Sequence, residues 1–252
     1  MKYLLIHSPG RKKRPFASQP GTYCKLFCND PHHPDSILNR PVTKEYRIGD
    51  TVFRGFPNLY PIAGCHNMIL KFDGEGYPHL PQAMDVETGK EFAGLAEQMP
   101  EDTVLYFNSK GAYASIPEHL HFQSIDLKPP VFHLLGRLPK TKPLQVVEQW
   151  PFGIIATASS EHFSRLAGLL NERNRPFNAL AMDGWFVVVP RVVPPGPLRY
   201  GIKPGALEMA GVKILEDATA VSDEEFIRIT AQTAIPHSEA HKLCEIVAPE
   251  SG

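Results

Sequence analysis

Proline occurs 25 times among the 252 residues, and this density limits the length that any helix or strand can reach. Proline fixes one backbone dihedral and lacks an amide hydrogen, so it ends helices and is confined to the edges of sheets. The sequence therefore predicts many short elements separated by loops. Its length suits one large domain or two small ones packed together.

Short apolar segments and periodic segments alternate along the chain. Stretches rich in β-branched and aromatic residues predict strands. They cover residues 1–8, 67–72, 103–109, 114–126, 152–158, 177–182, 185–190 and 212–217. Apolar residues at helical spacing behind capping residues predict helices. These cover residues 85–99, 159–174, 222–234 and 237–247.

The predicted strands come in neighbouring pairs joined by short turns, with helices between the pairs. This order favours an α+β class with antiparallel sheets and flanking helices over a doubly wound parallel sheet. Residues 11–49 are rich in Pro, Asn, Asp and Lys and are interpreted as loops. The proline-rich segment 129–143 suggests a boundary between two halves, residues 1–142 and 143–252.

The charge balance excludes several kinds of partner. The net charge is −1 and the isoelectric point is near 6.8, so nothing favours nucleic-acid or membrane-surface binding. No apolar run reaches the roughly 18 residues of a membrane span. Four cysteines in 252 residues are too few for a disulfide framework, so we expect reduced thiols and a cytoplasmic protein.

Three polar residues alternate with apolar ones in the predicted strand at residues 114–126. Because the side-chain period of a strand is two, His119, His121 and Gln123 should share one face. An imidazole whose second nitrogen is held by an acceptor is a nucleophile at neutral pH, and a neighbouring amide can donate to a phosphate oxygen. A histidine pair of this kind also occurs as a metal site or as ordinary strand residues. The small polar residues just upstream, which favour phosphate binding, are Asn108, Ser109, Gly111 and Ser115, with Lys110 between them as a solvated cation.

The run FNSKGAYASIPEHLHFQ, residues 107–123, resembles the histidine-triad superfamily in its galactose-1-phosphate uridylyltransferase branch. That branch carries H-x-H-x-Q preceded by Asn, Gly and Ser. The run is most similar to the GDP-hexose phosphorylases, and the segment RPFNALAMDGWFVVVPR is also similar to the diadenosine-tetraphosphate phosphorylases. Supporting likeness occurs in LYPIAGCHNMILKF and GALEMAGVKILED, so the resemblance extends over residues 58–216. It implies two histidine-triad-like halves packed as one unit.

The resemblance implies a nucleotidyltransferase of the phosphorylase type. His121 would attack the α-phosphorus of a nucleotide sugar of the GDP-hexose type, and the nucleotidyl group would pass from His121 to phosphate or a sugar phosphate. The backbone carbonyl of His119 would orient His121, and Gln123 would bind phosphoryl oxygens. The substrate phosphates would contact Asn108, Ser109, Gly111 and Ser115. Alternatives are a dinucleoside polyphosphate phosphorylase, a nucleotide hydrolase and a catalytically silent nucleotide-binding protein. A homodimer is also an alternative to a monomer.

The segment between Ser115 and His119 is one residue longer than in the family, with Pro117 and Glu118 in the gap. A bulge in the strand would absorb the extra residue. If it does not, Ser115 would lose its place as a phosphate ligand. The state of this segment therefore separates a working enzyme from a silent one.

The reaction that the resemblance implies requires no cofactor. A zinc site built from Cys24, Cys28, His66 and His119 is an alternative to reduced thiols, because some uridylyltransferases hold a metal with a cysteine pair and the first motif histidine. The spacing of the pair is C-x-x-x-C rather than C-x-x-C. The other interpretation of His66 is structural, as a hydrogen-bonded bridge between strand and loop.

Two further features of the second half carry expectations. Trp185 and Phe186 begin an alternating strand, which predicts that they lie in the core rather than stack on a base. Arg191 follows the end of that strand, and we expect it to form a surface salt bridge, with a contact to a substrate phosphate as the alternative.

Overall fold

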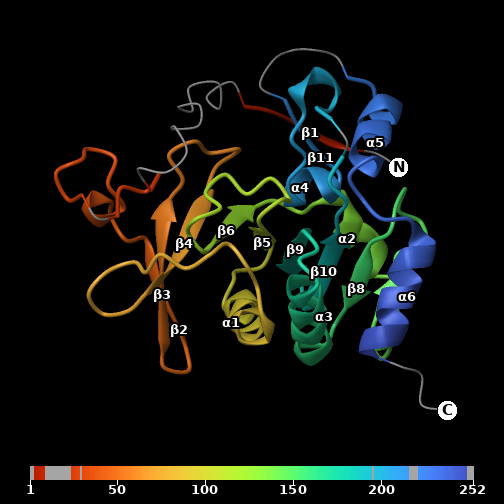
Figure 1. The fold of residues 1–252 in the computed structure, drawn as a ribbon, viewed down its shortest axis with the longest axis horizontal. Helices are drawn as coiled ribbons and strands as arrows, with labels where there is room; N and C mark the ends of the chain where they lie inside the picture. Colours follow the sequence, from red (N-terminus) through yellow and green to blue (C-terminus); the bar gives the residue numbers. More distant parts are fainter. Residues whose placement is uncertain (1–2, 9–23, 29, 195, 216–220, 249–252) are drawn as a thin grey trace.

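A nine-stranded antiparallel sheet forms the centre of the computed structural model, which describes residues 3–8, 24–28, 30–194, 196–215 and 221–248. The strands follow the spatial order β2-β3-β4-β6-β5-β9-β10-β8-β7 (Figure 1). Their bounds are β2 Lys44–Ile48, β3 Thr51–Pro57, β4 Asn67–Phe72, β5 Thr103–Asn108, β6 His121–Asp126, β7 Gln145–Val146, β8 Ile155–Thr157, β9 Phe177–Met182 and β10 Trp185–Pro190. The predicted α+β class with antiparallel sheet and flanking helices is confirmed.

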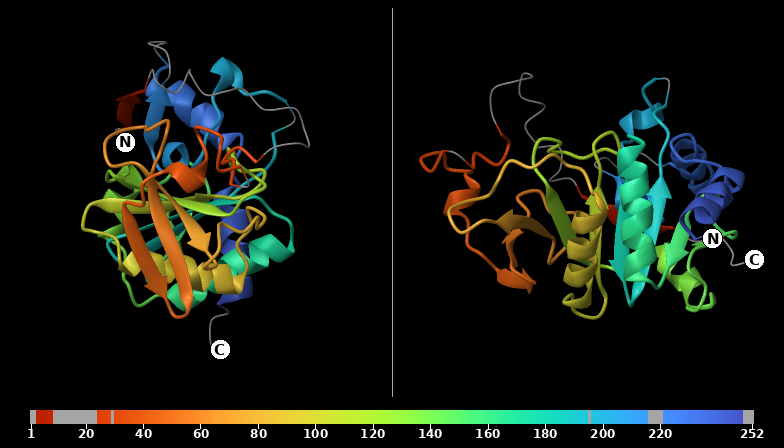
Figure 2. Two further views of the ribbon diagram at one scale, coloured as in Figure 1. Left: turned by 90° about the vertical axis from the view of Figure 1, so that its left-hand side faces the viewer. Right: turned by 60° about the horizontal axis from the view of Figure 1, so that its bottom comes forward.

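Helices cover the sheet and a second, smaller sheet lies beside it (Figure 2). In the smaller sheet, β1 (Leu4–His7) pairs in parallel with β11 (Val212–Leu215). The helix bounds are α1 Val86–Glu97, α2 Pro130–Leu135, α3 Ser160–Glu172, α4 Ala206–Met209, α5 Asp223–Ala231 and α6 His237–Val247. None of the helices in the described ranges is long and apolar enough to cross a membrane.

The pairing of β5 with β9 joins the strands of residues 44–126 to those of residues 145–190. Every residue of β5, β9 and β10 is buried, as expected for strands covered on both faces. The register sets Asn108 opposite Asn178 at the end of this pair. The polar side chains of Asn108 on β5 and Asn178 on β9 therefore meet at this end of the strand pair. The boundary between residues 142 and 143 stays a prediction.

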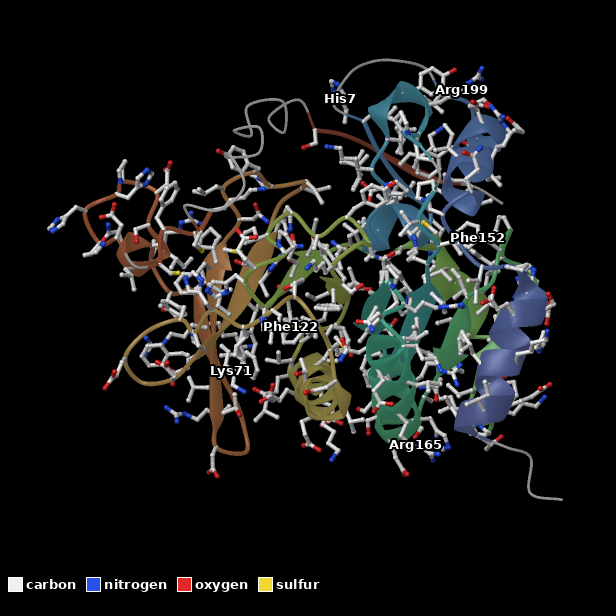
Figure 3. All side chains as sticks on the ribbon, viewed as in Figure 1. His7, Lys71, Phe122, Phe152, Arg165 and Arg199 are labelled. Carbon is white, nitrogen blue, oxygen red and sulfur yellow. The ribbon has the colours of Figure 1, made fainter. Side chains whose placement is uncertain are left out.

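The face of the sheet that α1, α3 and α6 cover packs around Phe122, which lies beside α1 (Figure 3). The ring centroid of Phe122 is 5.4 Å from that of Phe92 on α1 and 5.9 Å from those of Phe53 and Phe107. The other face carries two separate cores. One packs β8, β9 and β10 against α2 and α4, and the other packs β3 and β4 against Leu26 and neighbouring loop residues. Polar residues of β5 and β6 lie on this second face.

Gly89 in α1 and Gly168 in α3 are poor helix formers, but they permit close packing of the two helices. A Cβ on Gly89 would lie 3.0 Å from the Cα of Ser164, and a Cβ on Gly168 would lie 2.5 Å from the Cγ2 of Val86. The second distance is shorter than real Cβ contacts allow. The two helices therefore approach each other through surfaces without side chains.

We predict that Gly168→Ala lowers the free energy of unfolding by about 1–3 kcal/mol through overpacking against Val86, although alanine is the better helix former. Gly64→Ala is the control, because no atom lies within 4 Å of its added Cβ. Denaturant unfolding of both variants measures the difference. If both variants were as stable as the wild type, the helix contact would be looser than described.

The structure contains β3, β7 and α4, which were not predicted from the sequence, and it differs from the prediction at three further places. Residues 44–48 form strand β2 within a segment predicted to be loop, whereas residues 9–23 lie outside the described residues. The proline-rich segment 129–143 contains helix α2, whose first residue Pro130 needs no amide hydrogen at a helix start. The predicted strand at 114–126 begins only at His121, because residues 117–119 form a turn.

Candidate functional site

The side chain of Gln82 separates β5 from β6 where the two strands should continue to pair. Their register places Asn108 opposite His121, but neither backbone reaches the other. The Nε2 of Gln82 instead donates to the carbonyls of Asn108 (2.9 Å) and His121 (3.0 Å), and its Oε1 accepts from the amide of His121 (2.8 Å). Gln82 thus acts as an inserted peptide group that holds the strand ends apart.

Gln82→Met should strongly destabilise the protein, because an apolar side chain of similar size would leave three buried backbone groups without partners. Each such group costs about 1–3 kcal/mol, so we expect a loss of roughly 3 kcal/mol or more. Gln98→Met is the matched control, since Gln98 is exposed and donates to one carbonyl. Thermal unfolding of the pair measures the effect. Equal stability of the two variants would contradict this role of Gln82.

His121 is the first residue of β6 and is 2% exposed. Its Nδ1 lies 2.9 Å from the backbone oxygen of His119. A carbonyl only accepts, so Nδ1 carries the proton and the lone pair is on Nε2. Among the described residues, none binds this Nε2. Burial lowers the pKa of His121 to about 4, so the ring is neutral at pH 7. His121 is therefore a buried, uncharged imidazole, and it is not one of the residues that line the pocket described below.

His119 lies in the turn before β6 and not on the strand with His121 and Gln123, which corrects the sequence prediction. The amide of His119 donates to the carbonyl of Ile116 in the turn that absorbs the extra residue, so no bulge is needed. His119 is 1% exposed, and its Nδ1 donates to the oxygen of Leu120 (3.3 Å). Its Nε2 is buried and has no hydrogen-bond partner within the part of the chain that the structure describes. The hydrogen bond between the two histidines therefore uses the backbone carbonyl of His119 and not its ring.

Hydrogen bonds fix the orientation of the Gln123 amide. His66 Nδ1 accepts from the amide of Ile62 (3.1 Å), so a neutral His66 carries its proton on Nε2. That nitrogen lies 3.1 Å from Gln123 Oε1, and the hydroxyl of Tyr106 donates to the same oxygen (3.1 Å). Because the oxygen is engaged, the NH2 group of Gln123 is left as the donor. His66 is thus a hydrogen-bonded bridge and not a metal ligand.

Asn108 is oriented in the same way at the end of β5. Its Oδ1 accepts from Asn178 Nδ2 and from the amide of Ala206, both at 2.7 Å. Its NH2 group has no acceptor among the described residues. Asn108 and Gln123 therefore both present amide hydrogens rather than oxygens to a ligand.

A pocket that is open to solvent lies over these amides. Of the predicted site residues, Asn108, Ser115 and Gln123 line it, so the longer turn leaves Ser115 in place. The remaining lining residues are Ile62, Tyr106, Tyr113, Lys203, Gly205, Ala206, Leu207 and Glu208.

Two predicted substrate-binding residues have structural contacts instead of lining the pocket. The hydroxyl of Ser109 accepts from the amide of Phe177 (2.8 Å). Gly111 has a φ of 84°, and a Cβ there would lie 2.9 Å from the Cγ of Pro176. Both residues hold the turn after β5 against the start of β9. Lys110 is exposed, as predicted.

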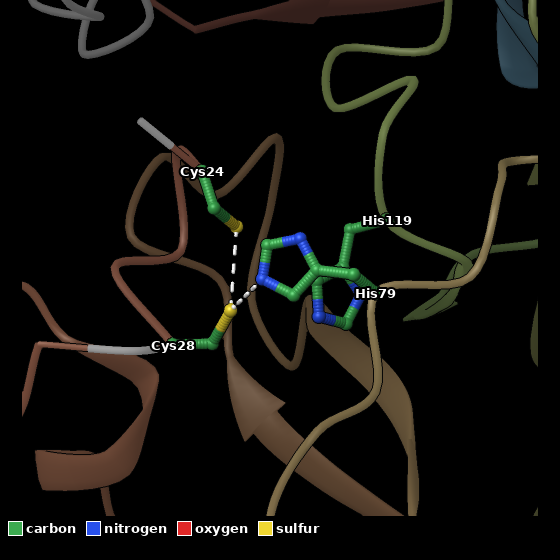
Figure 4. Close-up of side chains that lie close together, drawn as sticks. All are labelled: Cys24, Cys28, His79 and His119. Carbon is green, nitrogen blue, oxygen red and sulfur yellow. Dashed lines mark hydrogen bonds between the residues drawn. The ribbon is translucent and has the colours of Figure 1, made fainter. Parts of the chain in front are cut away.

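A second cluster lies on the other side of the turn that contains His119 (Figure 4). The ligand atoms of Cys24, Cys28, His79 and His119 all lie within 4.8 Å of one another. The two sulfurs are 3.5 Å apart, and Cys28 Sγ is 2.6 Å from His79 Nε2. Burial raises the pKa of the Cys28 thiol to about 12, so a cation would be needed to hold the thiolate. The set corrects the predicted one, because His79 takes the place of His66.

Arg191, Gln82, His79 and Lys203 are site residues that sequence reasoning missed or misread. Arg191 is 2% exposed and forms no surface salt bridge. Gln82, His79 and Lys203 lie in loops that are far from the motif along the chain, and no sequence pattern around them marks them as site residues. Trp185 and Phe186 are buried in the two cores, as predicted.

Comparisons with known proteins agree with this fold. The family described as "Domain of unknown function (DUF4922)" matches residues 36–126, which include the H-x-H-x-Q motif. No curated protein matches the chain. The yeast Ap4A phosphorylase Apa2 in complex with AMP has a similar structure, with a TM-score of 0.55 and 16% identity over 74% of each chain. A second structure of Apa2 gives a TM-score of 0.53 at 16% identity, over 73% of this chain and 72% of Apa2.

The ADP-glucose phosphorylase from Arabidopsis thaliana with bound ADP-glucose aligns over 90% of this chain and 94% of its own, with a TM-score of 0.39 and 16% identity. At these identities the likeness to Apa2 shows a shared fold. The fold that the sequence resemblance implied is thereby confirmed.

Proposed function

We propose that this chain, which has the fold of yeast Ap4A phosphorylase Apa2, is a nucleotidyltransferase of the phosphorylase type with His121 as nucleophile. One observation carries the proposal. The bond from His121 Nδ1 to the carbonyl of His119 leaves the Nε2 lone pair free. The Asn108 and Gln123 amides, on the same face, are oriented as donors for phosphoryl oxygens.

In the first half-reaction, His121 Nε2 forms a bond to the α-phosphorus, and the bond from that phosphorus to the bridging oxygen breaks. The leaving phosphate group keeps the electron pair. The ring becomes positively charged as it is nucleotidylated, and the hydrogen bond from Nδ1 to the His119 carbonyl stabilises this charge. The amides of Asn108 and Gln123 stabilise the negative oxygens of the transferred group.

In the second half-reaction, an oxygen of inorganic phosphate attacks the nucleotidyl group and the bond to His121 Nε2 breaks. The products are a nucleoside diphosphate and the free, neutral imidazole. Phosphate is a better acceptor than water here, because Gln123 cannot remove a proton and phosphate needs no general base. Lys203, an exposed cation at the pocket, would attract the incoming anion.

The donor that we propose is a nucleotide sugar of the GDP-hexose type. The second candidate donor is a dinucleoside polyphosphate, which the likeness to an Ap4A phosphorylase favours. Both donors contain the nucleoside 5′-phosphoryl group that the His121 chemistry requires, so the two candidates share one mechanism.

The cluster of Cys24, Cys28, His79 and His119 would hold a zinc ion, which we propose as a structural metal. Two thiols and two imidazoles are the ligands of structural zinc sites, and the partnerless Nε2 of His119 fits a ligand nitrogen. Such an ion supplies no step of the reaction. These residues tie the turn before β6 to two other segments, and that turn presents the carbonyl that orients His121.

The test is a panel of GDP-glucose, diadenosine tetraphosphate and UDP-glucose, each incubated with and without phosphate. We expect nucleoside diphosphate to form from one of them only when phosphate is present. Without phosphate, the intact mass of the protein should rise by one nucleotidyl group on His121. Phosphate-independent release of nucleoside monophosphate would instead indicate a hydrolase. Nucleotide binding with neither turnover nor adduct would indicate a silent binding protein and overturn the proposal.

A further inference from the structure

Arg191 is a buried cation beside the site, yet none of its described contacts is a carboxylate. It follows β10, and its side chain donates four hydrogen bonds. Nε donates to the carbonyl of Thr233 (2.8 Å) and Nη2 to the hydroxyl of the same residue (2.6 Å). Nη1 donates to the carbonyl of Pro204 (2.8 Å) and to Asn178 Oδ1. A buried charge is costly unless polar groups compensate it, and here four hydrogen bonds and the nearby Glu208 carboxylate do so.

The guanidinium remains charged at neutral pH. Burial lowers the pKa of Arg191 to about 10, while the nearby Glu208 carboxylate and Tyr113 act in the opposite direction. The ring of Tyr113 lies 5.6 Å from the guanidinium carbon, and Glu208 Oε2 accepts from the amide of Gly205. Tyr113, Glu208 and Gly205 all line the pocket, so Arg191 lies directly behind its wall.

Arg191 also contributes to the orientation of two amides, together with the backbone groups of Ala112 and Ala206. Arginine only donates, so Asn178 must present its oxygen to Arg191. The NH2 of Asn178 then faces away from Arg191 and donates to Asn108 Oδ1 (2.7 Å) and to the carbonyl of Ala112 (3.1 Å). The oxygen of Asn108 is thus occupied by two donors, Asn178 and the amide of Ala206, and the NH2 group of Asn108 is left for the pocket. Arg191 donates to Asn178 and Asn178 donates to Asn108, so the direction of donation runs from the guanidinium to the pocket wall.

The bond to Pro204 extends this control to a second segment of the pocket wall. Pro204 lies between Lys203 and Gly205, which both line the pocket. One guanidinium therefore holds the β5–β9 side and the 203–205 side in fixed relation.

We infer that Arg191 is a positioning residue, which orients the Asn108 amide through Asn178 and places a fixed positive charge behind the bound phosphoryl group. The inference rests on the proposed function for the identity of the ligand. Arg191 itself does not touch the reacting atoms.

A double-mutant cycle tests the inference through kcat/KM for phosphorolysis of the best donor in the panel. Arg191→Lys should lower kcat/KM roughly 10- to 100-fold, because lysine keeps the charge but cannot bond Asn178, Pro204 and Thr233 together. Asn108→Ala should lower it at least as much. The double variant should match Asn108→Ala alone to within about threefold, because the two residues act through one donor.

Two more variants separate positioning from stability. Thr233→Val removes one acceptor of Arg191 on the side away from Asn178, so it should lower Tm and keep kcat/KM within about twofold. Asn178→Leu breaks the relay while leaving Arg191 in place, and it serves if Arg191→Lys does not fold. It should lower kcat/KM roughly 10-fold or more and be non-additive with Asn108→Ala.

Additive losses in either cycle, or wild-type kcat/KM in Arg191→Lys or Asn178→Leu, would overturn the inference while the wild type remained active. Failure of the proposed function would look different, because the wild type itself would then show neither phosphorolysis nor adduct. In that case the same cycle on the dissociation constant of GMP or AMP decides the inference. Non-additive losses of affinity would support it, and additive losses would overturn it.

Discussion

His121→Asn is expected to lower the turnover number at least about 10⁴-fold while Tm stays within a few degrees of the wild type. Asparagine can still donate to the carbonyl of His119, so the hydrogen bond at the start of β6 persists. Asparagine has no nitrogen at the position of Nε2, and the lone pair of its amide nitrogen is delocalised and therefore not nucleophilic. The strand should therefore fold as before and the chemistry should stop. Steady-state phosphorolysis, intact-protein mass and thermal unfolding measure the three parts of this result.

The matched control is His241→Asn, since His241 is exposed on α6 and pairs with Glu148. It should keep full activity and accept the nucleotidyl group. Wild-type turnover in His121→Asn would remove His121 from the mechanism. A nucleotidyl adduct on the His121→Asn protein would do the same, because it would place the nucleophile elsewhere.

Elements with a continuous apolar pattern could be predicted from the sequence. The hairpin of β9 and β10 is buried along its whole length, and its residues carry this pattern. Helix α3 begins where Ser159 caps it, and α6 has the predicted bounds. Strand β2 was missed because it lies at the edge of the sheet, where Tyr46 is its only buried side chain. A strand with one buried residue has no readable alternation.

The candidate site could be predicted only where the motif is local. Two of the H-x-H-x-Q residues, His121 and Gln123, lie on the strand as predicted. The strand alternation of side chains does not extend to His119, because residues 117–119 form a turn. The strand begins only at His121, whose backbone amide donates to Gln82. His79, Gln82 and Arg191 come from other segments and meet the motif only in the folded chain. Local spacing does not encode such contacts.

The second large effect is expected at the cluster of Cys24, Cys28, His79 and His119. Loss of one of these ligands should change both the metal content and the thermal stability of the protein. The purified protein should contain about one zinc ion per chain, and Cys28→Ser should lose most of it. The four ligands join residues 24–28, 79 and 119, so the loss should lower Tm by roughly 5–15 °C. Turnover should fall as well, because the turn that presents the His119 carbonyl would no longer be held.

Cys65→Ser is the matched control, because Cys65 is exposed and lies outside the cluster. It should keep its zinc, its Tm and its activity. Metal analysis by mass spectrometry and thermal unfolding give readouts that do not depend on the reaction. If wild-type protein made in zinc-supplemented medium contained no metal, or if both variants lost it equally, the zinc site would be wrong. The proposal for His121 would still stand, since its hydrogen bond is to a backbone carbonyl and not to a side chain of the cluster.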